Sequence, residues 1–123
     1  MKIKQRKEAD VKRAVQDYLK LRNFRWFRMQ SGQIMGQHKG KPWMMRLCPP
    51  GTPDFLVLRP IRPDQMGSLA IWLEVKRPLG PRGGSGGSDQ SPEQVEFQRA
   101  AEANGERYRV VRDIEGLINA LSD

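Results

Sequence analysis

Two short apolar runs, separated by a connection that contains proline and glycine, constrain the fold of this chain more than any other feature. Residues 55–58 and 69–75 have the length of strands, and such apolar runs are typical of strands buried on both faces. Residues 59–68 between them contain Pro60, Pro63 and Gly67, so this stretch must connect the two strands. We therefore expect a central antiparallel hairpin.

Counting along this hairpin brings two acidic side chains together at its open end. With Asp64 as the centre, residues equidistant from it face each other, so Leu58 faces Ala70, Leu56 faces Trp72, and Asp54 faces Glu74. A slip of the register by a residue or two would still leave both acids at the open end of the hairpin. Facing residues in a sheet lie about 4.5–5.5 Å apart, and like charges there destabilise the pair. The arrangement predicts a bound cation. Mg²⁺ or Mn²⁺ is expected, because Mg²⁺ usually binds one or two carboxylates together with waters and substrate phosphate oxygens.

A lysine follows the second acid at the spacing that a strand requires. Glu74 and Lys76 are two residues apart and leave the same face of the strand, whereas Val75 points into the core. Lys76 would orient or help deprotonate an attacking water, or its ammonium would screen the charge that builds on a phosphorane. A Glu-x-Lys sequence alone is a common accident, but here the hairpin brings it to the same place as Asp54.

The N-terminal part predicts a helix followed by a basic strand pair. Residues 8–22 carry apolar side chains at helical spacing and place Lys12 on the outer face. Residues 25–30 form a strand, and residues 43–47 form a second short strand that is able to pair back with it. Residues 36–41 form a basic, flexible loop between these strands, suited to approach a phosphate backbone.

The C-terminal part predicts helix, strand and helix. Ser91 is the N-cap of the next helix, Pro92 is its first residue and Gln94 completes a capping box. Gly105 ends this helix. A strand over residues 107–112 and a short helix capped by Asp113 follow.

Two further segments connect these elements, and the whole chain is expected to form one unit. Residues 49–53 are a rigid turn, and residues 80–88, which are mostly glycine and serine, are a flexible loop near the site. The element order α-β-β-β-β-α-β-α predicts a single α/β domain over residues 1–123, with a mixed central sheet flanked by helices.

The charge is concentrated in the N-terminal part of the chain. Residues 1–48 hold thirteen basic and three acidic residues, a net charge of +10, while the remaining residues sum to −2. Clustered Lys and Arg attract phosphates and gain affinity by releasing condensed counterions, so DNA is the expected partner, although a basic surface also serves solubility. A membrane surface is the weakest alternative, because no segment has the roughly 18 to 20 apolar residues of a membrane span.

Cysteine and histidine usage excludes several kinds of site. One cysteine, Cys48, allows no intrachain disulfide, and with one histidine, His38, it builds no structural zinc site. The N-terminus has no apolar segment typical of a secretory signal. We therefore expect an intracellular, cytoplasmic protein, with a phage-encoded one acting in its host cell as a variant of this expectation.

Three motifs in the same order resemble a known nuclease family. Residues 51–54 read Gly-Thr-Pro-Asp, residues 73–76 read Leu-Glu-Val-Lys, and residues 91–94 read Ser-Pro-Glu-Gln. This combination resembles the PD-(D/E)XK nuclease superfamily and, more closely, its VRR-NUC (virus-type replication-repair nuclease) branch. The likeness extends from Glu8 to about Asp113 and implies a restriction-endonuclease-like core.

The resemblance implies a role for each matching residue. Asp54 and Glu74 would bind the metal with the main-chain carbonyl of Val75, and Lys76 would serve the attacking water. Glu8 matches an acidic residue that approaches the metal, although an acid in a first turn also favours the helix dipole. Gln94 matches a glutamine that touches the lysine or the scissile phosphate, although its capping-box position explains it equally well.

Candidate DNA contacts come from the basic part of the chain. Phosphate contacts position a duplex without reading its sequence, so general DNA geometry rather than base sequence is the expected target. Trp26 and Trp43 are more often core residues than base-stacking platforms at such positions. The candidate backbone contacts are Arg25, Arg28, Lys39, Lys41 and Arg46.

Together these observations predict an Mg²⁺-dependent endonuclease that hydrolyses phosphodiester bonds in branched or four-way DNA. By the resemblance, stand-alone members of the branch act as homodimers on Holliday junctions. The first helix and the aromatic hairpin over residues 25–47 would supply the dimer contact, unless the apolar side chains of the hairpin complete the monomer core; these are Trp26, Phe27, Trp43, Met44 and Met45. The alternatives are a restriction-like or nicking phage endonuclease and a DNA-binding module without catalysis.

Overall fold

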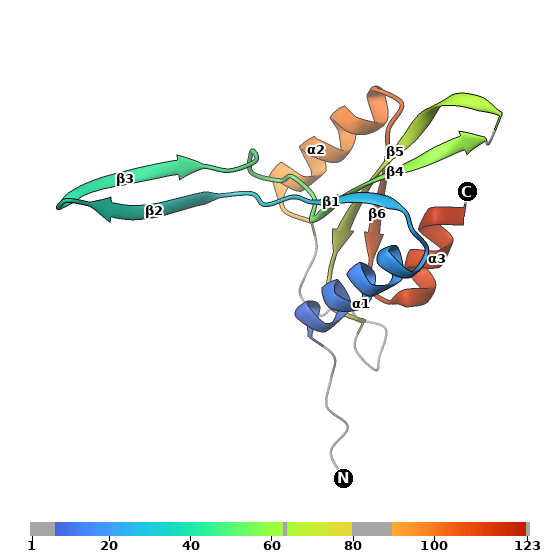
Figure 1. Cartoon of the computed structure of the whole chain (residues 1–123), viewed down its shortest axis with the longest axis horizontal. Helices are drawn as coiled ribbons and strands as arrows, with labels where there is room; N and C mark the ends of the chain where they lie inside the picture. The colour runs from blue at the N-terminus through green and yellow to red at the C-terminus, as the bar shows by residue number, and fades with distance from the viewer. Residues whose placement is uncertain (1–6, 63, 80–89, 123) are drawn as a thin grey trace, which may run out of the picture.

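The computed structural model describes residues 7–62, 64–79 and 90–122. A mixed four-stranded sheet flanked by helices forms the body, and a separate two-stranded sheet projects from it as a long arm (Figure 1). The elements in chain order are α1 (Glu8–Leu21), β1 (Arg25–Arg28), β2 (Gln33–His38), β3 (Lys41–Arg46), β4 (Phe55–Arg62), β5 (Gln65–Val75), α2 (Pro92–Ala103), β6 (Arg107–Val111) and α3 (Ile114–Ser122).

The central hairpin has the register that counting predicts. The sheet order is β1-β4-β5-β6, in which β4 is antiparallel to both neighbours and β6 is parallel to β5. Leu58 pairs with Ala70 and Leu56 pairs with Trp72, as expected. The strands are longer than predicted, because β4 continues through Pro60 to Arg62. The register shifts between Pro60 and Arg62, and such irregularities are where a sheet accommodates proline.

The two faces of the sheet are covered by different helices. On one face, α1 and α3 contact each other and enclose the aliphatic core, in which residues such as Val15, Phe55 and Leu73 are fully buried. On the other face, the ring of Phe97 in α2 lies 4.8 Å from the ring of Trp72, measured between centroids. Because Glu74 follows Trp72 by two residues, its side chain leaves the sheet on the face that α2 covers.

Strands β2 and β3 form the arm, and here the prediction is wrong. The arm strands pair with each other from Gln33 and Arg46 to His38 and Lys41, while β1 pairs with β4. Residues 36–41 are therefore strand ends and a tight turn, not a flexible loop. Lys39 and Gly40 form this turn with φ angles of 50° and 77°, as hairpin turns with two positive φ angles require.

Gly36 explains why the sequence pattern did not predict β2, the first strand of the arm. Glycine is disfavoured in strands, so residues 33–38 lack a strand pattern. In the structure the ring of Trp43 lies directly across from Gly36, where a Cβ atom would be only 2.4 Å from Cζ2 of the indole. Trp43 thus packs on the arm and is 43% exposed, so its predicted core position is wrong. Trp26 does pack on the core, with its ring 5.8 Å from that of Phe55.

The helix boundaries largely follow their predicted signals. The Ser91 hydroxyl accepts a hydrogen bond from the Gln94 N–H at 3.2 Å, and α2 ends just before Gly105, which has a φ of +82°. The Asp113 carboxylate accepts a hydrogen bond of 2.7 Å from the Gly116 N–H at the start of α3. The predicted loop over residues 80–88 lies outside the described residues. Within the described ranges, no helix combines the length and apolar content needed to cross a membrane.

Candidate active site

A turn that is docked on α2 places Asp54 at the start of β4. Gly51 in this turn has a φ of +89°, and a Cβ atom there would lie 2.4 Å from the carbonyl oxygen of Glu93. Only glycine allows this close approach of the turn to the first turn of α2. The Thr52 hydroxyl donates a hydrogen bond of 2.7 Å to the Pro49 carbonyl and closes the turn. The position of Asp54 is therefore tied to that of α2.

Asp54 is held by the two strands on either side of β4. Its carbonyl accepts a hydrogen bond of 2.8 Å from the Met29 N–H, which follows β1. Its Oδ2 atom accepts a hydrogen bond of 2.7 Å from the Val75 N–H at the end of β5. The predicted meeting of Asp54 with the end of β5 is thus observed.

Glu74 and Lys76 lie on the same face of the β5 end, as predicted from their spacing. Their exposed fractions are only 5% and 8%, whereas Val75 between them is fully buried in the aliphatic core. The Nζ atom of Lys76 lies 3.8 Å from Oε1 of Glu74. An acid and a base are therefore buried side by side at the edge of the core.

Gln94 connects these two side chains to α2. Its Nε2 donates a hydrogen bond of 3.0 Å to Oε1 of Glu74, and its Oε1 accepts one of 3.1 Å from Nζ of Lys76. The same Oε1 accepts a hydrogen bond of 2.9 Å from the Ser91 N–H. Both predicted roles of Gln94, in the capping box and at Lys76, are thus present together.

Helix α1 contributes Glu8 and a lysine that the sequence placed elsewhere. Lys12 lies 3.2 Å from Oδ1 of Asp54 and 3.7 Å from Oε2 of Glu8. The prediction that Lys12 is on the outer face of the helix is wrong, because this face of α1 turns toward the site. The sequence did contain a signal for this position of Lys12. Residues four apart on a helix lie on the same face, so a helix that brings Glu8 to the site also brings Lys12 there.

The carboxyl group of Glu74 is strongly perturbed. Burial, and after it the charge of Asp54, raise the pKa of Glu74 from 4.5 to about 8; Lys76 opposes this rise. The Oε2 atom of Glu74 is buried and has no hydrogen-bond partner among the described residues. A buried carboxylate oxygen without a partner needs either a proton or a cation.

Five predicted site residues line one cavity of about 420 Å³: Glu8, Asp54, Glu74, Lys76 and Gln94. Among the described residues, no three His, Cys, Asp or Glu side chains lie close enough to hold one metal ion together. Mg²⁺ needs only one or two carboxylates, so Asp54 and the open oxygen of Glu74 fit such an ion. Val75 contributes its N–H to Asp54 and does not line the described part of this cavity; a metal contact of its carbonyl stays a prediction.

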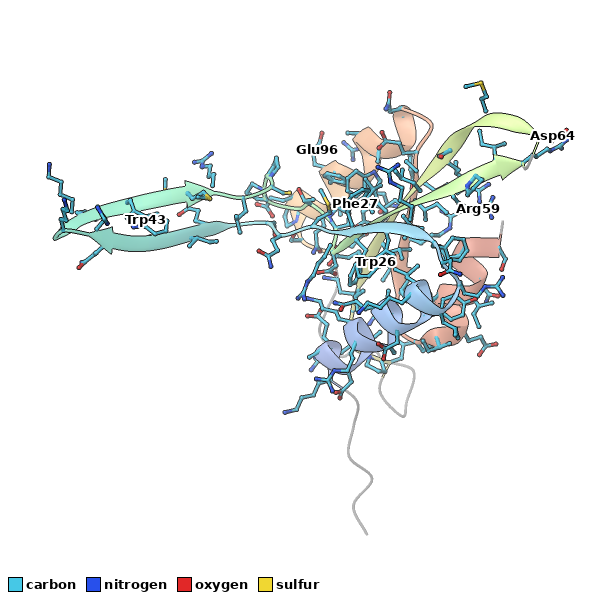
Figure 2. All side chains as sticks on the ribbon, viewed as in Figure 1. Trp26, Phe27, Trp43, Arg59, Asp64 and Glu96 are labelled. Atoms are coloured by element: carbon cyan, nitrogen blue, oxygen red, sulfur yellow. The ribbon has the colours of Figure 1, made fainter. Side chains whose placement is uncertain are left out.

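The candidate DNA contacts are spread along the basic half of the chain, which supplies both the projecting arm, where Trp43 lies, and the part of the body around Trp26 (Figure 2). Arg28 lines a small cavity beside Asp54, whereas the guanidinium of Arg25 lies 5.4 Å from the ring centroid of Phe27. Lys39 and Lys41 lie at the tip of the arm, and Arg46 is exposed at the opposite end of β3. The structure thus brings Arg28 close to the site, places Lys39 and Lys41 at the far end of the arm, and places Arg46 at the end of the arm that joins the body.

Comparison with known proteins does not identify a family, because no family model, curated protein or solved structure matches this chain significantly. The functional interpretation therefore depends on the motifs and on the geometry of the site.

Proposed function

We propose that this chain is a metal-dependent endonuclease that hydrolyses phosphodiester bonds in DNA, with Asp54, Glu74 and Lys76 as its cleavage centre. One observation carries the proposal: Gln94 bonds to both Glu74 and Lys76, and all three face the same cavity as Asp54. The crowded carboxylates supply oxygen ligands for a cation, and the lysine supplies a positive charge beside them.

The reaction assigns a task to each side chain. Asp54 and Glu74 would hold Mg²⁺ or Mn²⁺, which would acidify a bound water and stabilise negative charge on phosphate oxygens. The water would give a proton to solvent, its oxygen would bond to phosphorus, and the bond from phosphorus to the leaving sugar oxygen would break, with that oxygen taking a proton from solvent. Lys76, oriented by Gln94, would position that water and offset the charge of the pentacovalent phosphorane.

The burial of these charges favours an enzyme over a DNA-binding module without catalysis. Glu74 and Lys76 are at least nine-tenths buried, and taking such groups out of water costs free energy that their mutual attraction often fails to recover. A surface that only binds DNA needs exposed cations and gains nothing from a buried acid. A catalytic centre does gain, because its groups act in a water-poor environment.

The proposed family is the VRR-NUC branch of the PD-(D/E)XK superfamily. Three features support it: the three sequence motifs, a mixed sheet with the acidic residues at the end of its central hairpin, and the contact of Gln94 with Lys76. By the same resemblance we propose branched or four-way DNA as the substrate and a two-fold homodimer as the active form. Two equivalent sites would match the two symmetric cuts of a four-way junction.

The arm offers surface for both partners. From residue 18 to residue 53 the chain contains seven Lys and Arg residues and no Asp or Glu, so the arm and its surroundings attract phosphates. Its middle exposes apolar side chains, including Met44 and Met45, which are 55% and 54% exposed. An isolated two-stranded hairpin is at best marginally stable in water, so a partner that covers these residues would stabilise the arm.

The test is a cleavage assay on duplex, flap, splayed-arm and four-way DNA, with Mg²⁺, Mn²⁺ or a chelator. We expect metal-dependent cuts that are lost in Asp54→Asn, Glu74→Gln and Lys76→Met, while DNA binding persists because the basic half supplies the affinity. Glu96→Gln, which changes an exposed acid of α2, is the matched control and should cut normally. Full activity of an Asp54 or Glu74 variant would refute the site, and absence of cleavage from every DNA would refute the nuclease.

A further inference from the structure

A second polar cavity of about 250 Å³ adjoins the one that holds the carboxylates. The two cavities share Asp54, Ser31 and Thr52 as lining residues. Their chemistry differs, because the first contains Glu8 and Glu74, whereas the second contains no acid other than the shared Asp54 among its described lining residues. Two cations line the second cavity instead, Lys12 and Arg28.

The two cations reach this cavity from different elements. Lys12 comes from α1, and its side chain is 26% exposed. Arg28 is the last residue of β1, where it pairs with Phe55 immediately beside Asp54. The side chain of Arg28 forms no ion pair or hydrogen bond with the described residues, so its guanidinium is available to bind an anion. Arginine and lysine converging on a polar cavity are the usual means by which proteins bind phosphate.

Lys12 forms an ion pair with Asp54, and a metal ion held by Asp54 would change this pairing. A divalent cation on Asp54 would repel the ammonium group, which lies 3.2 Å from Oδ1 of the same carboxylate. The four-carbon stem of lysine allows the ammonium to turn into the second cavity. The cavity would then present two cations beside an occupied metal site.

We propose that the second cavity binds the phosphate group adjacent to the scissile one, with Lys12 and Arg28 as its ligands. The proposal rests on the nuclease function proposed above. The two cavities share Asp54 as a lining residue. When the scissile phosphate of a DNA strand lies in the carboxylate cavity, a neighbouring phosphate of the same strand therefore lies at the adjoining cavity. The contact fixes the position of the strand relative to the water, and it carries no base specificity.

The experiment removes the charge from one phosphate at a time. The cut is first mapped on unmodified DNA, and methylphosphonate, which is uncharged, then replaces the phosphate on either side of it. For the wild type we expect about a tenfold or greater fall in kcat/KM at one of these two positions, as for a lost charge-assisted contact. Lys12→Met and Arg28→Gln should be slower on unmodified DNA and should lose most of this sensitivity.

The controls separate this role from other roles of the same residues. Lys20→Met, which changes an exposed lysine of the same helix, should retain the wild-type sensitivity. Calorimetry with Mn²⁺ should show that Lys12→Met still binds the metal, and circular dichroism should show that it folds. Arg28→Gln tests the same site independently if Lys12→Met proves to be destabilised.

Two failures are distinguishable. If the wild type cuts unmodified DNA but both variants keep its full methylphosphonate sensitivity, the adjacent-phosphate site is refuted while the nuclease stands. If neither neighbouring methylphosphonate slows the wild type, the site is equally refuted. If the wild type cuts no DNA, the proposed function itself fails.

Discussion

The side-chain amide of Gln94 lies 3.0 Å from Oε1 of Glu74 and thereby joins the first turn of α2 to the end of β5. The same side chain accepts hydrogen bonds from Lys76 and from the Ser91 N–H. Gln94 therefore stabilises the start of a helix and holds the side chains of Glu74 and Lys76 at the same time.

Substitutions at Gln94 and Ser91 should separate these two functions. Ser91→Ala removes the cap side chain and should cost about 0.5–2 kcal/mol of stability, with cleavage largely retained below the melting temperature. Gln94→Ala should cost a similar amount but also slow cleavage strongly, because Lys76 and Glu74 lose their shared partner. Urea unfolding and cleavage rates measure the two effects. Equal activity of the two variants would show that Gln94 is only a capping residue.

The stability of the metal-free protein should fall as pH rises from about 4.5 to 8. Because the pKa of Glu74 is raised from 4.5 to about 8, mainly by burial, the folded chain holds a proton that the unfolded chain releases in this range. Glu74→Gln has no such proton and should flatten the pH dependence of the free energy of unfolding, measured in chelator. Glu96→Gln is the control for an exposed acid. If the free energy of unfolding of Glu74→Gln depended on pH as steeply as that of the wild type, the raised pKa of Glu74 would be contradicted.

Replacing the two lysines at the arm tip should change the salt dependence of DNA binding. Each phosphate contact that is lost should reduce the slope of log K against log salt by about 0.9 on duplex DNA. Lys39→Ala combined with Lys41→Ala should therefore flatten this slope, while a change of base sequence within one DNA architecture should matter little. Fluorescence anisotropy at several salt concentrations measures the slope. An unchanged slope would place the DNA surface elsewhere.

The exposed apolar residues of the arm predict self-association. Met and aromatic side chains are enriched at interface cores, and light scattering should give twice the 14.1 kDa of one chain. Met44→Glu and Met45→Glu should yield monomers with an intact fold, because both residues are more than half exposed. A monomeric wild type that cuts only flaps or single strands would remove the dimer and the junction substrate but leave the cleavage centre.

The central hairpin could be predicted from the sequence because simple periodicity determines it. Two apolar runs around one connection place both acids at the open end of the hairpin even if the register slips by a residue or two, and the observed register brings Asp54 to the end of β5. The arm was missed because Gly36 interrupts the strand pattern of its first strand. The glycine is needed there because the ring of Trp43 on the facing strand occupies the space of a side chain. The site position of Lys12 was missed because packing sets the rotation of α1 about its axis. That rotation turns Lys12 toward Asp54, whereas the polar composition of this helix face predicts contact with solvent.

The arm pairs only within itself among the described residues, whereas every strand of the body is part of one shared sheet. Its length and charge can therefore vary without disturbing the residues around Glu74. Under the proposed function, changes in the arm would alter how tightly the chain binds DNA without altering the side chains around Glu74, and replacement of residues 33–46 by a short linker should leave the fold of the body intact.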